Sequence, residues 1–493
     1  MKATTTKSNK ILLYLILVIL ISIPIFTKLS ALPFREYDEA RLATNAYEMH
    51  KNGNWLVTYF HNAPEMWNTK PPFLIWLQVI CIKLLGFGEL AIRLPIAIAA
   101  FLTCILLFGM CAKYLEDELL GFIAAITLAS MSGFIHVHIS RTGDYDGLLI
   151  FFITPSSFWF FVFLETKQNK FLYFFFLTLA LGVLTKSVAA LLFSPAIFIY
   201  CVWQKQLVDI LKNKHFYFSL SIFLFIAIGY YLLREHYNPG YIKAVQQNEL
   251  GGRFLHTLEY HKESFWFYYN NILKDHVYYW ILIPCGLLIG LSSKDKRIVR
   301  FTVFITLIVI TFFLIISKAQ TKLDWYSAPL FPFLALLIAL FIRSIVIVLT
   351  YIDHKKYLNH NVLPIIFLFL VLIIPYQKVV HDSYLSEEYS WDVERYRMSY
   401  YLKSELDKSD KTNTLNNFKL LYQGWGETNL YLYIKMLQEK GINVSKKDHT
   451  QLSPGDSVVT CSDNIKSDLS EHYNFTVISE DQQITKYNIL SLK

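Results

Sequence analysis

The chain has 493 residues, of which 54% are hydrophobic, 16% aromatic and only 17% charged. Soluble globular chains seldom reach this balance, so the composition excludes an ordinary soluble enzyme and indicates a membrane protein. The formal net charge is +8, but the lysines and arginines lie in short loops between apolar runs and do not form one basic patch, so we expect no nucleic-acid partner. The six cysteines are scattered without CxxC or Cys/His spacing, which predicts packing roles and no disulfide framework.

Eleven apolar runs are long enough to cross about 30 Å of hydrocarbon. They lie at 11–27, 90–112, 119–138, 147–164, 171–185, 188–203, 216–233, 277–292, 299–317, 327–349 and 362–379. The first run has the length of a signal peptide, but we expect it to be retained because the later loops need it for their topology. Two short runs meet at Lys186-Ser187 and are either two tilted helices or one broken segment. The sequence therefore predicts a mainly α, polytopic membrane protein with about 11–13 transmembrane helices.

Basic residues recur in every second loop. They are Lys113, Lys167, Lys170, Lys205, Lys212, Lys214, Lys294, Lys296, Arg297, Arg300, Lys355 and Lys356. By the positive-inside rule, the N-terminus lies in the cytoplasm. This orientation places four parts of the chain on the outer side of the cytoplasmic (inner) membrane: the loop 28–89, the stretch 141–146, the loop 234–276 and the C-terminal tail.

The tail differs in kind from the rest of the chain. Residues 385–493 are polar and contain strand-like runs at 418–422, 457–461 and 475–479, with helical spacing at 429–440. We therefore expect a transmembrane domain over residues 1–384, followed by a small soluble α/β domain over 385–493.

The first outer loop contains a helix-like stretch that begins at Asp38. Asp38, Arg41 and Asn45 lie at i, i+3 and i+7, so one helical face presents a carboxylate, a guanidinium and an amide together. Acidic residues also suit the start of any surface helix, which is the alternative interpretation. Further along, Lys70 precedes two prolines that hold it in an extended conformation above the membrane; alternatively, it extends to lipid headgroups.

Other charged side chains lie close to the ends of apolar runs. Asp146 lies at the end of a membrane helix, where a carboxylate is costly unless it has an oppositely charged partner or a functional role. Alternatively, Asp146 caps the N-terminus of that helix. We expect Asp144 to be the solvent-facing cap of the pair. Lys186 lies at the outer end of another apolar run, and Arg93 is expected to be an interfacial anchor.

Suppose that these groups form one pocket. Lysine and arginine would then stabilise a departing phosphate, and a carboxylate would deprotonate the attacking group. The sequence has no Gly-rich phosphate loop and no HExxH motif, and nucleotide sugars are not expected outside, so a lipid-linked donor is favoured. A transporter or flippase of lipid-linked or anionic substrates is the alternative, although the spans carry few of the mid-membrane charges that it would need. A non-catalytic membrane scaffold is the third hypothesis.

At these residues the chain resembles the GT-C glycosyltransferases, specifically the bacterial relatives of protein O-mannosyltransferases and of the aminoarabinose transferase that modifies lipid A. The matching motifs, in family order, are Tyr37-Asp38-Glu39-Ala40-Arg41, Lys70-Pro71-Pro72, Arg93-Leu94-Pro95, Arg141 with Asp146, Leu184-Thr185-Lys186, Phe265-Trp266-Phe267-Tyr268-Tyr269 and Lys322-Leu323-Asp324-Trp325-Tyr326. The resemblance implies inverting transfer of a sugar from a polyprenyl-phosphate donor to lipid A, a protein or another envelope glycan.

The resemblance also implies roles for individual residues. Asp38 would be the catalytic base; Lys70 and Arg253 would bind the donor phosphate; Arg41, Lys186 and Tyr326 would be further donor ligands; and Glu39, Asp146 and Lys322 would line the pocket. Relatives of the lipid A enzyme usually carry a glutamate before Lys-Pro-Pro, where this chain has Thr69. We therefore do not expect this chain to share a metal site that depends on that glutamate. The sequence predicts no required cofactor and leaves the binding of a divalent cation open.

Overall fold

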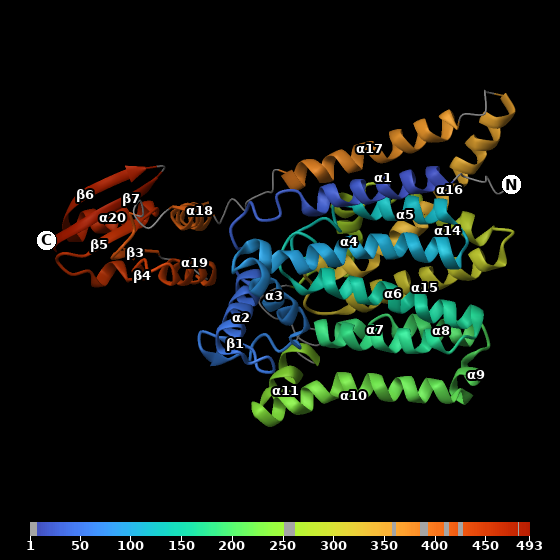
Figure 1. Ribbon diagram of the computed structural model, residues 1–493, viewed down its shortest axis with the longest axis horizontal. Coiled ribbons are helices and arrows are strands. Elements are labelled where there is room, and N and C mark those ends of the chain that lie inside the picture. Colours follow the sequence, from blue (N-terminus) through green and yellow to red (C-terminus); the bar gives the residue numbers. More distant parts are fainter. Residues whose placement is uncertain are drawn as a thin grey trace.

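The computed structural model describes residues 7–250, 262–356, 361–384, 393–408, 414–422, 427–481 and 483–493. Its body is a bundle of long helices that run side by side, with the N-terminus at one end and a small sheet region beyond the other end (Figure 1). The chain is a multi-pass membrane protein, and the predicted mainly α fold is confirmed.

Seven helical segments in the described part of the chain are long and apolar enough to cross a membrane. They are α4 (Glu89–Tyr114), α6 (Tyr145–Thr166), α7 (Lys170–Lys186) with the 3₁₀ segment η1 (Ser187–Leu191), α10 (Lys214–Tyr237), α15 (Lys296–Lys318), α16 (Phe331–Lys356) with the 3₁₀ segment η4 (Asp324–Leu330) before it, and α17 (Val362–Tyr384).

The shorter apolar helices are α1 (Lys7–Phe26), α3 (Phe73–Leu85), α5 (Glu118–Ala129), α8 (Ser194–Trp203) and α14 (Leu282–Leu291). Each of the eleven predicted apolar runs thus contains a helix, although four of those helices fall short of a full span. The junction at Lys186-Ser187 separates two helices, because Ser187 has a φ of 50° and ends α7.

Close backbone contacts hold the bundle together. A Cβ on Gly286 of α14 would lie 1.7 Å from the carbonyl oxygen of Leu337 in α16, so only glycine permits this approach. Similarly, a Cβ on Gly147 would lie 2.1 Å from the carbonyl oxygen of Ile139. That second contact fixes the loop before α6 against the first turn of α6, where several functional candidates lie.

One end of the bundle carries the short elements of the two long loops, as Figure 1 shows for α2, β1 and α11. The first loop forms α2 (Asp38–Asn52) and a hairpin of β1 (Tyr59–Phe60) and β2 (Ala63–Pro64). Helix α2 ends at Asn52, because Gly53 adopts the left-handed conformation with a φ of 70°. The second long loop forms α11 (Tyr241–Val245), α13 (Phe267–Asn271) and two π-helical turns, Gln246–Leu250 and Ile272–His276. Helix α9 (Leu207–Lys212) lies at the opposite end of the bundle, between α8 and α10 (Figure 1).

The C-terminal region is a small α/β unit. Its five-stranded sheet has the order β4-β3-β5-β7-β6 and is built from β3 (Phe418–Leu420), β4 (Ser445–Lys446), β5 (Ser457–Thr460), β6 (Tyr473–Asp481) and β7 (Ile484–Leu492). Strand β3 is parallel to β4 and β5, and the other pairs are antiparallel. The helices are α18 (Val393–Asp407), α19 (Thr428–Glu439) and α20 (Asp463–His472), with a 3₁₀ turn at His449–Gln451. The exact division at 384/385 stays a prediction.

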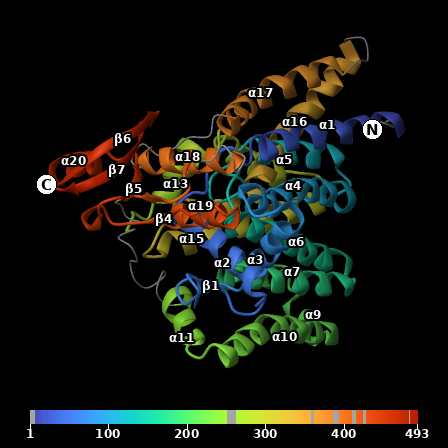
Figure 2. The same cartoon turned by 60° about the vertical axis from the view of Figure 1, so that its left-hand side comes forward.

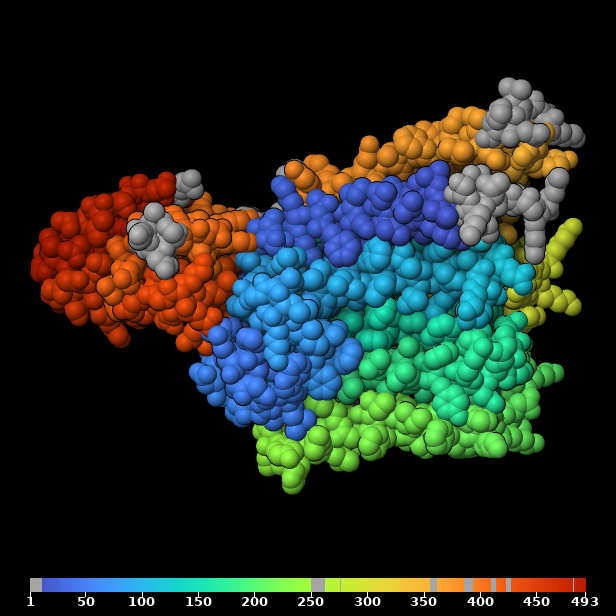
Figure 3. Space-filling model, viewed as in Figure 1, coloured from blue at the N-terminus to red at the C-terminus, as the bar shows by residue number. Residues whose placement is uncertain are grey.

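This α/β unit docks on the first loop. The Glu36 carboxylate accepts hydrogen bonds from the backbone amides of Thr428 and Asn429, at 3.1 and 2.9 Å, and so meets the positive end of α19. The Tyr433 hydroxyl donates to Glu89 at 2.5 Å. Figure 2 shows the sheet projecting beyond the helical bundle, and Figure 3 shows this lobe beside the surface of the first loop.

Candidate active site

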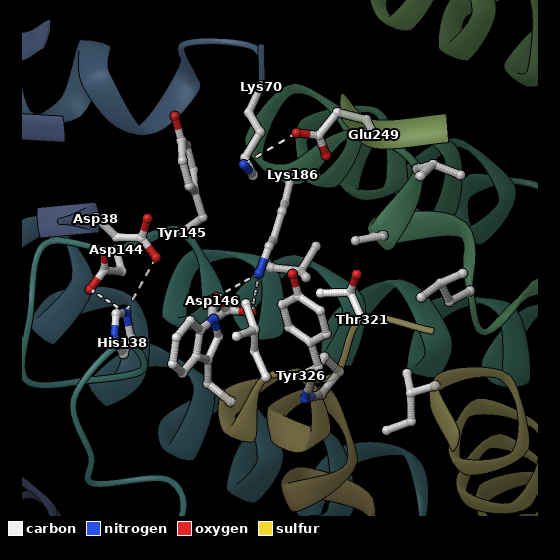
Figure 4. A pocket seen from close by; sticks show the side chains of 18 of the residues that line it. Asp38, Lys70, His138, Asp144, Tyr145, Asp146, Lys186, Glu249, Thr321 and Tyr326 are labelled. Carbon is white, nitrogen blue, oxygen red and sulfur yellow. Dashed lines mark hydrogen bonds and ion pairs between the residues drawn. The ribbon is translucent and has the colours of Figure 1, made fainter. Parts of the chain in front are cut away.

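A cavity of about 190 Å³ lies at the end of the bundle that carries α2. The elements around it come from distant parts of the sequence: α2, the loop before α6, and the ends of α7 and α15, with η4. Figure 4 shows the polar side chains that point toward one another there. The polar lining includes Asp38, Arg41, Asn68, Lys70, His138, Asp144, Tyr145, Asp146, Lys186, Glu249, Thr321 and Tyr326, and the apolar lining includes Leu149, Val188, Leu192, Phe312, Ile315 and Ile316.

Asp38 is the exposed carboxylate of the cavity. It is the first residue of α2, and 58% of its side chain is exposed to solvent. Its Oδ2 lies 3.9 Å from Nδ1 of His138. A carboxylate that is held by a helix start and still open to solvent has the access that a general base needs.

Glu39, the next residue, points away from the cavity and is buried against Arg93. The Arg93 guanidinium donates to both Glu39 oxygens at 2.7 and 2.8 Å, and it also donates to the carbonyl oxygens of Leu29, Leu32 and Pro33. Burial by itself would raise the pKa of Glu39, but the adjacent Arg93 charge and hydrogen bonds lower it overall. Glu39 is therefore absent from the cavity lining that we expected it to join, and Arg93 is a buried structural partner instead of an interfacial anchor.

Arg41 lines the cavity and is held by a residue that the sequence analysis did not identify. Its guanidinium donates to both oxygens of Glu65, at 3.0 and 3.1 Å. Glu65 is buried and also accepts the backbone amides of Trp67 and Asn68. Glu65 thus joins α2 to the segment that leads to Lys70. Glu65 directly follows the two-residue strand β2, and no local sequence pattern indicates that it has a role at the site.

Two lysines of the cavity are each compensated by a carboxylate. Lys70 lies 3.2 Å from Glu249 and 5.4 Å from the centre of the Tyr145 ring. Lys186 donates to both oxygens of Asp146 at 2.6 Å. Lys186 and Asp146 are both largely buried, so each supplies the countercharge that the other needs at the membrane boundary.

The ring of Tyr326 completes this group. Its centre is 5.1 Å from the Lys186 ammonium, close enough for a cation–π contact. Lys322, from the same motif, points elsewhere, because its ammonium donates to the carbonyl of Ala319 at 2.6 Å and it is not among the lining residues. Arg253 lies outside the described residues.

The loop between α5 and α6 adds His138 and Asp144. We expected a helix over 119–138, but α5 ends at Ala129, and the turns that follow bring His138 into the cavity. Asp144 is also buried, so its expected role as a solvent-facing cap is wrong. Burial lowers the pKa of His138, but the Asp144 charge outweighs it and raises the pKa overall. The ring of His138 stacks on Trp325 at 3.7 Å.

Residues 69–231 match the family model described as dolichyl-phosphate-mannose-protein mannosyltransferase. Among curated proteins, an undecaprenyl phosphate-alpha-4-amino-4-deoxy-L-arabinose arabinosyl transferase of Proteus mirabilis is 26% identical over 341 residues, which is 68% of this chain and 59% of that protein. An uncharacterized Aquifex aeolicus protein is 24% identical over 341 residues, covering 68% of this chain and 63% of its own length. The chain thus spans about three fifths of the length of these relatives.

Solved structures share the fold. ArnT from Cupriavidus metallidurans, crystallised with undecaprenyl phosphate, has a TM-score of 0.65 at 12% identity, and the match covers 98% of each chain. The Archaeoglobus fulgidus oligosaccharyltransferase has a TM-score of 0.56 at 12% identity, covering 92% of this chain and 66% of that one. The chain thus shares its fold with these structures, and it is similar in sequence to the mannosyltransferase family model and to the curated relatives.

Proposed function

We propose that this protein is a membrane glycosyltransferase that moves a sugar from a polyprenyl-phosphate donor to an acceptor on the outer face of the cytoplasmic membrane. The observation that carries the proposal is the composition of one cavity. It brings the exposed carboxylate of Asp38 together with Lys70 and Lys186 on one side, and it has an apolar wall formed by α15 and the η1 segment on another. A lipid-linked phosphate would match both parts of this lining, because its phosphate would face the lysines and its hydrocarbon chain would contact the apolar wall. The transferases and the undecaprenyl phosphate complex named above support the same donor class.

The chemistry follows from these positions. The acceptor hydroxyl or amine attacks the anomeric carbon, a bond forms between them, and the bond from that carbon to the phosphate oxygen breaks. Asp38 takes the proton of the attacking group, and general base catalysis of this kind contributes about 10²–10⁴-fold. Polyprenyl phosphate is the leaving group. The attack from the opposite side inverts the configuration at the anomeric carbon.

The basic side chains would stabilise the negative charge that develops on the departing phosphate. Lys70 and Lys186 are the leading donor ligands, with Arg41, Tyr326 and Arg253 as further ones, because charge-assisted hydrogen bonds to a developing anion stabilise the transition state. In the structure the two lysines are paired with Glu249 and Asp146. A bound phosphate would therefore compete with carboxylates that keep the ammonium groups in place beforehand.

We place the N-terminus in the cytoplasm and the C-terminal α/β unit outside, as the distribution of basic loops indicates. The acceptor is lipid A, a protein or another envelope glycan. The C-terminal unit, which packs beside the cavity end of the bundle through α19 and α2, lies on the side from which a water-exposed acceptor would approach.

The experiment compares envelope and lipid-extractable glycans by mass spectrometry in cells that carry the wild type, a deletion, Asp38→Asn or Lys70→Ala. We expect both variants to lose the sugar modification that the deletion loses, while the protein remains at wild-type amounts in the membrane. The lost mass would then give the sugar and the acceptor together.

Two matched variants control for the substitutions themselves. Asp463→Asn changes an exposed aspartate that also opens a helix, α20, with 86% of its side chain exposed. Lys243→Ala removes an exposed lysine from α11. Both should keep the modification. If Asp38→Asn and Lys70→Ala also keep it, the proposed transfer is refuted and a transporter or a scaffold replaces it.

A further inference from the structure

The residue before Asp38 has a backbone conformation that is unfavourable for a large side chain. Tyr37, which directly precedes α2, has a φ of 70° and a ψ of −112°. Glycine adopts this mirror image of the β conformation readily, but a residue with a Cβ does so only at an energetic cost. Such strain persists when the surrounding structure holds the chain on both sides of the strained residue. The contacts on either side of Tyr37 therefore decide whether it keeps this conformation.

The bundle holds the chain that follows Tyr37. Glu39 is anchored by the ion pair described above, and its Oε2 accepts a hydrogen bond from the backbone amide of Arg35 at 2.8 Å. The backbone amide of Arg41 donates to the carbonyl oxygen of Tyr37 at 3.0 Å and closes the first turn of α2, which contains Asp38. The Tyr37 side chain does not cap this turn, although helices usually begin with a side chain that does. The direction of the Tyr37 carbonyl, which its ψ angle sets, therefore helps to fix Asp38.

The C-terminal α/β unit holds residues 34–36, which lead into the strained residue. Two backbone amides at the start of α19 donate to the Glu36 carboxylate, at 3.1 and 2.9 Å. The side-chain amide of Asn429 donates to the carbonyl oxygen of Phe34 at 3.4 Å, and the backbone amide of Phe34 donates to the Tyr433 hydroxyl at 3.1 Å. Glu36, Asn429 and Tyr433 are buried, so water competes little for these hydrogen bonds.

The side chain of Tyr37 does not account for the strained conformation. Tyr37 is 54% exposed, and its ring centre lies 5.9 Å from the guanidinium carbon of Arg395 in α18, at the outer limit of a cation–π contact. The hydrogen bonds from α19 on one side and from the bundle on the other therefore hold Tyr37. Release of residues 34–36 would let Tyr37 rotate to a negative φ. Its carbonyl would then turn away from Arg41, and the first turn of α2 would open at Asp38.

From these observations we propose that the C-terminal unit is a working part of the active site. Through Glu36, Asn429 and Tyr433 it holds Tyr37 in its strained conformation, and it thereby positions the Asp38 carboxylate at the cavity. Glu36, Asn429 and Tyr433 are positioning residues, because none of them is among the cavity lining. The inference rests on the proposed function for the role of Asp38 as general base, and a misplacement of about 1 Å costs a catalytic group about 10²-fold in rate.

The test is a double-mutant cycle on the full chain. Glu36→Ala removes the acceptor of the two α19 amides, and Tyr37→Gly removes the strain. We expect Glu36→Ala to reduce sugar transfer about tenfold or more, measured by mass spectrometry of envelope glycans at matched amounts of protein. Binding of undecaprenyl phosphate to the purified chain should stay at the wild-type level. In the Tyr37→Gly background, Glu36→Ala should reduce transfer by less than about threefold, because glycine keeps the conformation without the contacts of α19.

Hydrogen exchange reads the same cycle without any substrate. Exchange at the backbone amides of Ala40 and Arg41 should rise in Glu36→Ala, and it should rise less when Tyr37→Gly is also present. The matched control is Lys51→Ala, which removes another contact between α2 and α19, because the Lys51 ammonium lies 2.6 Å from Glu439 at the far end of α2. The control should leave both transfer and exchange in the first turn unchanged.

Melting curves check that each variant is folded, and Asn429→Ala replaces Glu36→Ala if the latter does not fold. Wild-type transfer in the folded variant, or equal losses with and without Tyr37→Gly, would overturn the inference. A parallel loss of undecaprenyl phosphate binding would overturn it as well, because the C-terminal unit would then act through the donor. If the exchange cycle behaves as expected but Asp38→Asn keeps the sugar modification, the proposed function fails and the coupling between the C-terminal unit and α2 stands.

Discussion

Replacing Glu39 with glutamine tests how the first loop is held. Glu39 is 1% exposed and Arg93 is 2% exposed. In Glu39→Gln the guanidinium keeps its three carbonyl contacts but loses its countercharge in a buried position. Breaking one side of a buried pair costs about 3–5 kcal/mol, so we expect the free energy of unfolding to fall by that amount.

The assay is equilibrium unfolding in mixed micelles, with SDS as the denaturant and helical circular dichroism as the signal. Glu116→Gln is the control, because Glu116 is 61% exposed and 3.5 Å from Arg297, and exposed pairs contribute about 0–1 kcal/mol. Arg93→Met alone should cost more than Glu39→Gln, since three carbonyl groups lose their donor as well. Adding Glu39→Gln to Arg93→Met should recover part of the loss, because the Glu39 carboxylate is then no longer a buried charge without its guanidinium partner. The reasoning is refuted if Glu39→Gln costs no more than Glu116→Gln.

Three further outcomes are expected. Glu65→Gln should keep the protein folded but reduce transfer about tenfold or more, chiefly through weaker donor binding, because the charge that holds the adjacent guanidinium in the cavity is lost; a wild-type KM for the donor would contradict this. Lys186→Met should lower the melting temperature, and adding Asp146→Asn should restore it without restoring transfer; if the double variant melts below the single one, the pair is not a buried ion pair. Finally, burial raises the pKa of Glu439 but its bonds to Lys51 and Tyr47 lower it overall. The contribution of the Glu439 carboxylate to stability is therefore fully present when the pH is above 4.5, the ordinary pKa of glutamate, and it is lost as the pH falls towards the lowered pKa. Over that pH range, hydrogen exchange in α19 should rise in the wild type and should rise less in Glu439→Gln.

The sequence by itself determined the membrane architecture. Length and apolarity decide whether a segment can cross hydrocarbon, and these are properties of contiguous residues, so each predicted run contains a helix. The same holds for the end of α2 at Gly53, where the left-handed conformation favours glycine over every other residue. Charged residues just outside the apolar runs were visible in the same way, and Asp38, Lys70, Lys186 and Asp146 all line the cavity.

Only the tertiary structure decided which neighbours share the site. Successive residues of a helix point in different directions, so Asp38 opens to the cavity while Glu39 is buried against Arg93, 54 positions away. Asp146 and Lys186 are 40 positions apart and meet because α6 and α7 pack together. His138, Asp144 and Glu65 gain their importance from contacts with distant segments, and an amino-acid sequence shows the order of residues along the chain but not the contacts made when the helices pack.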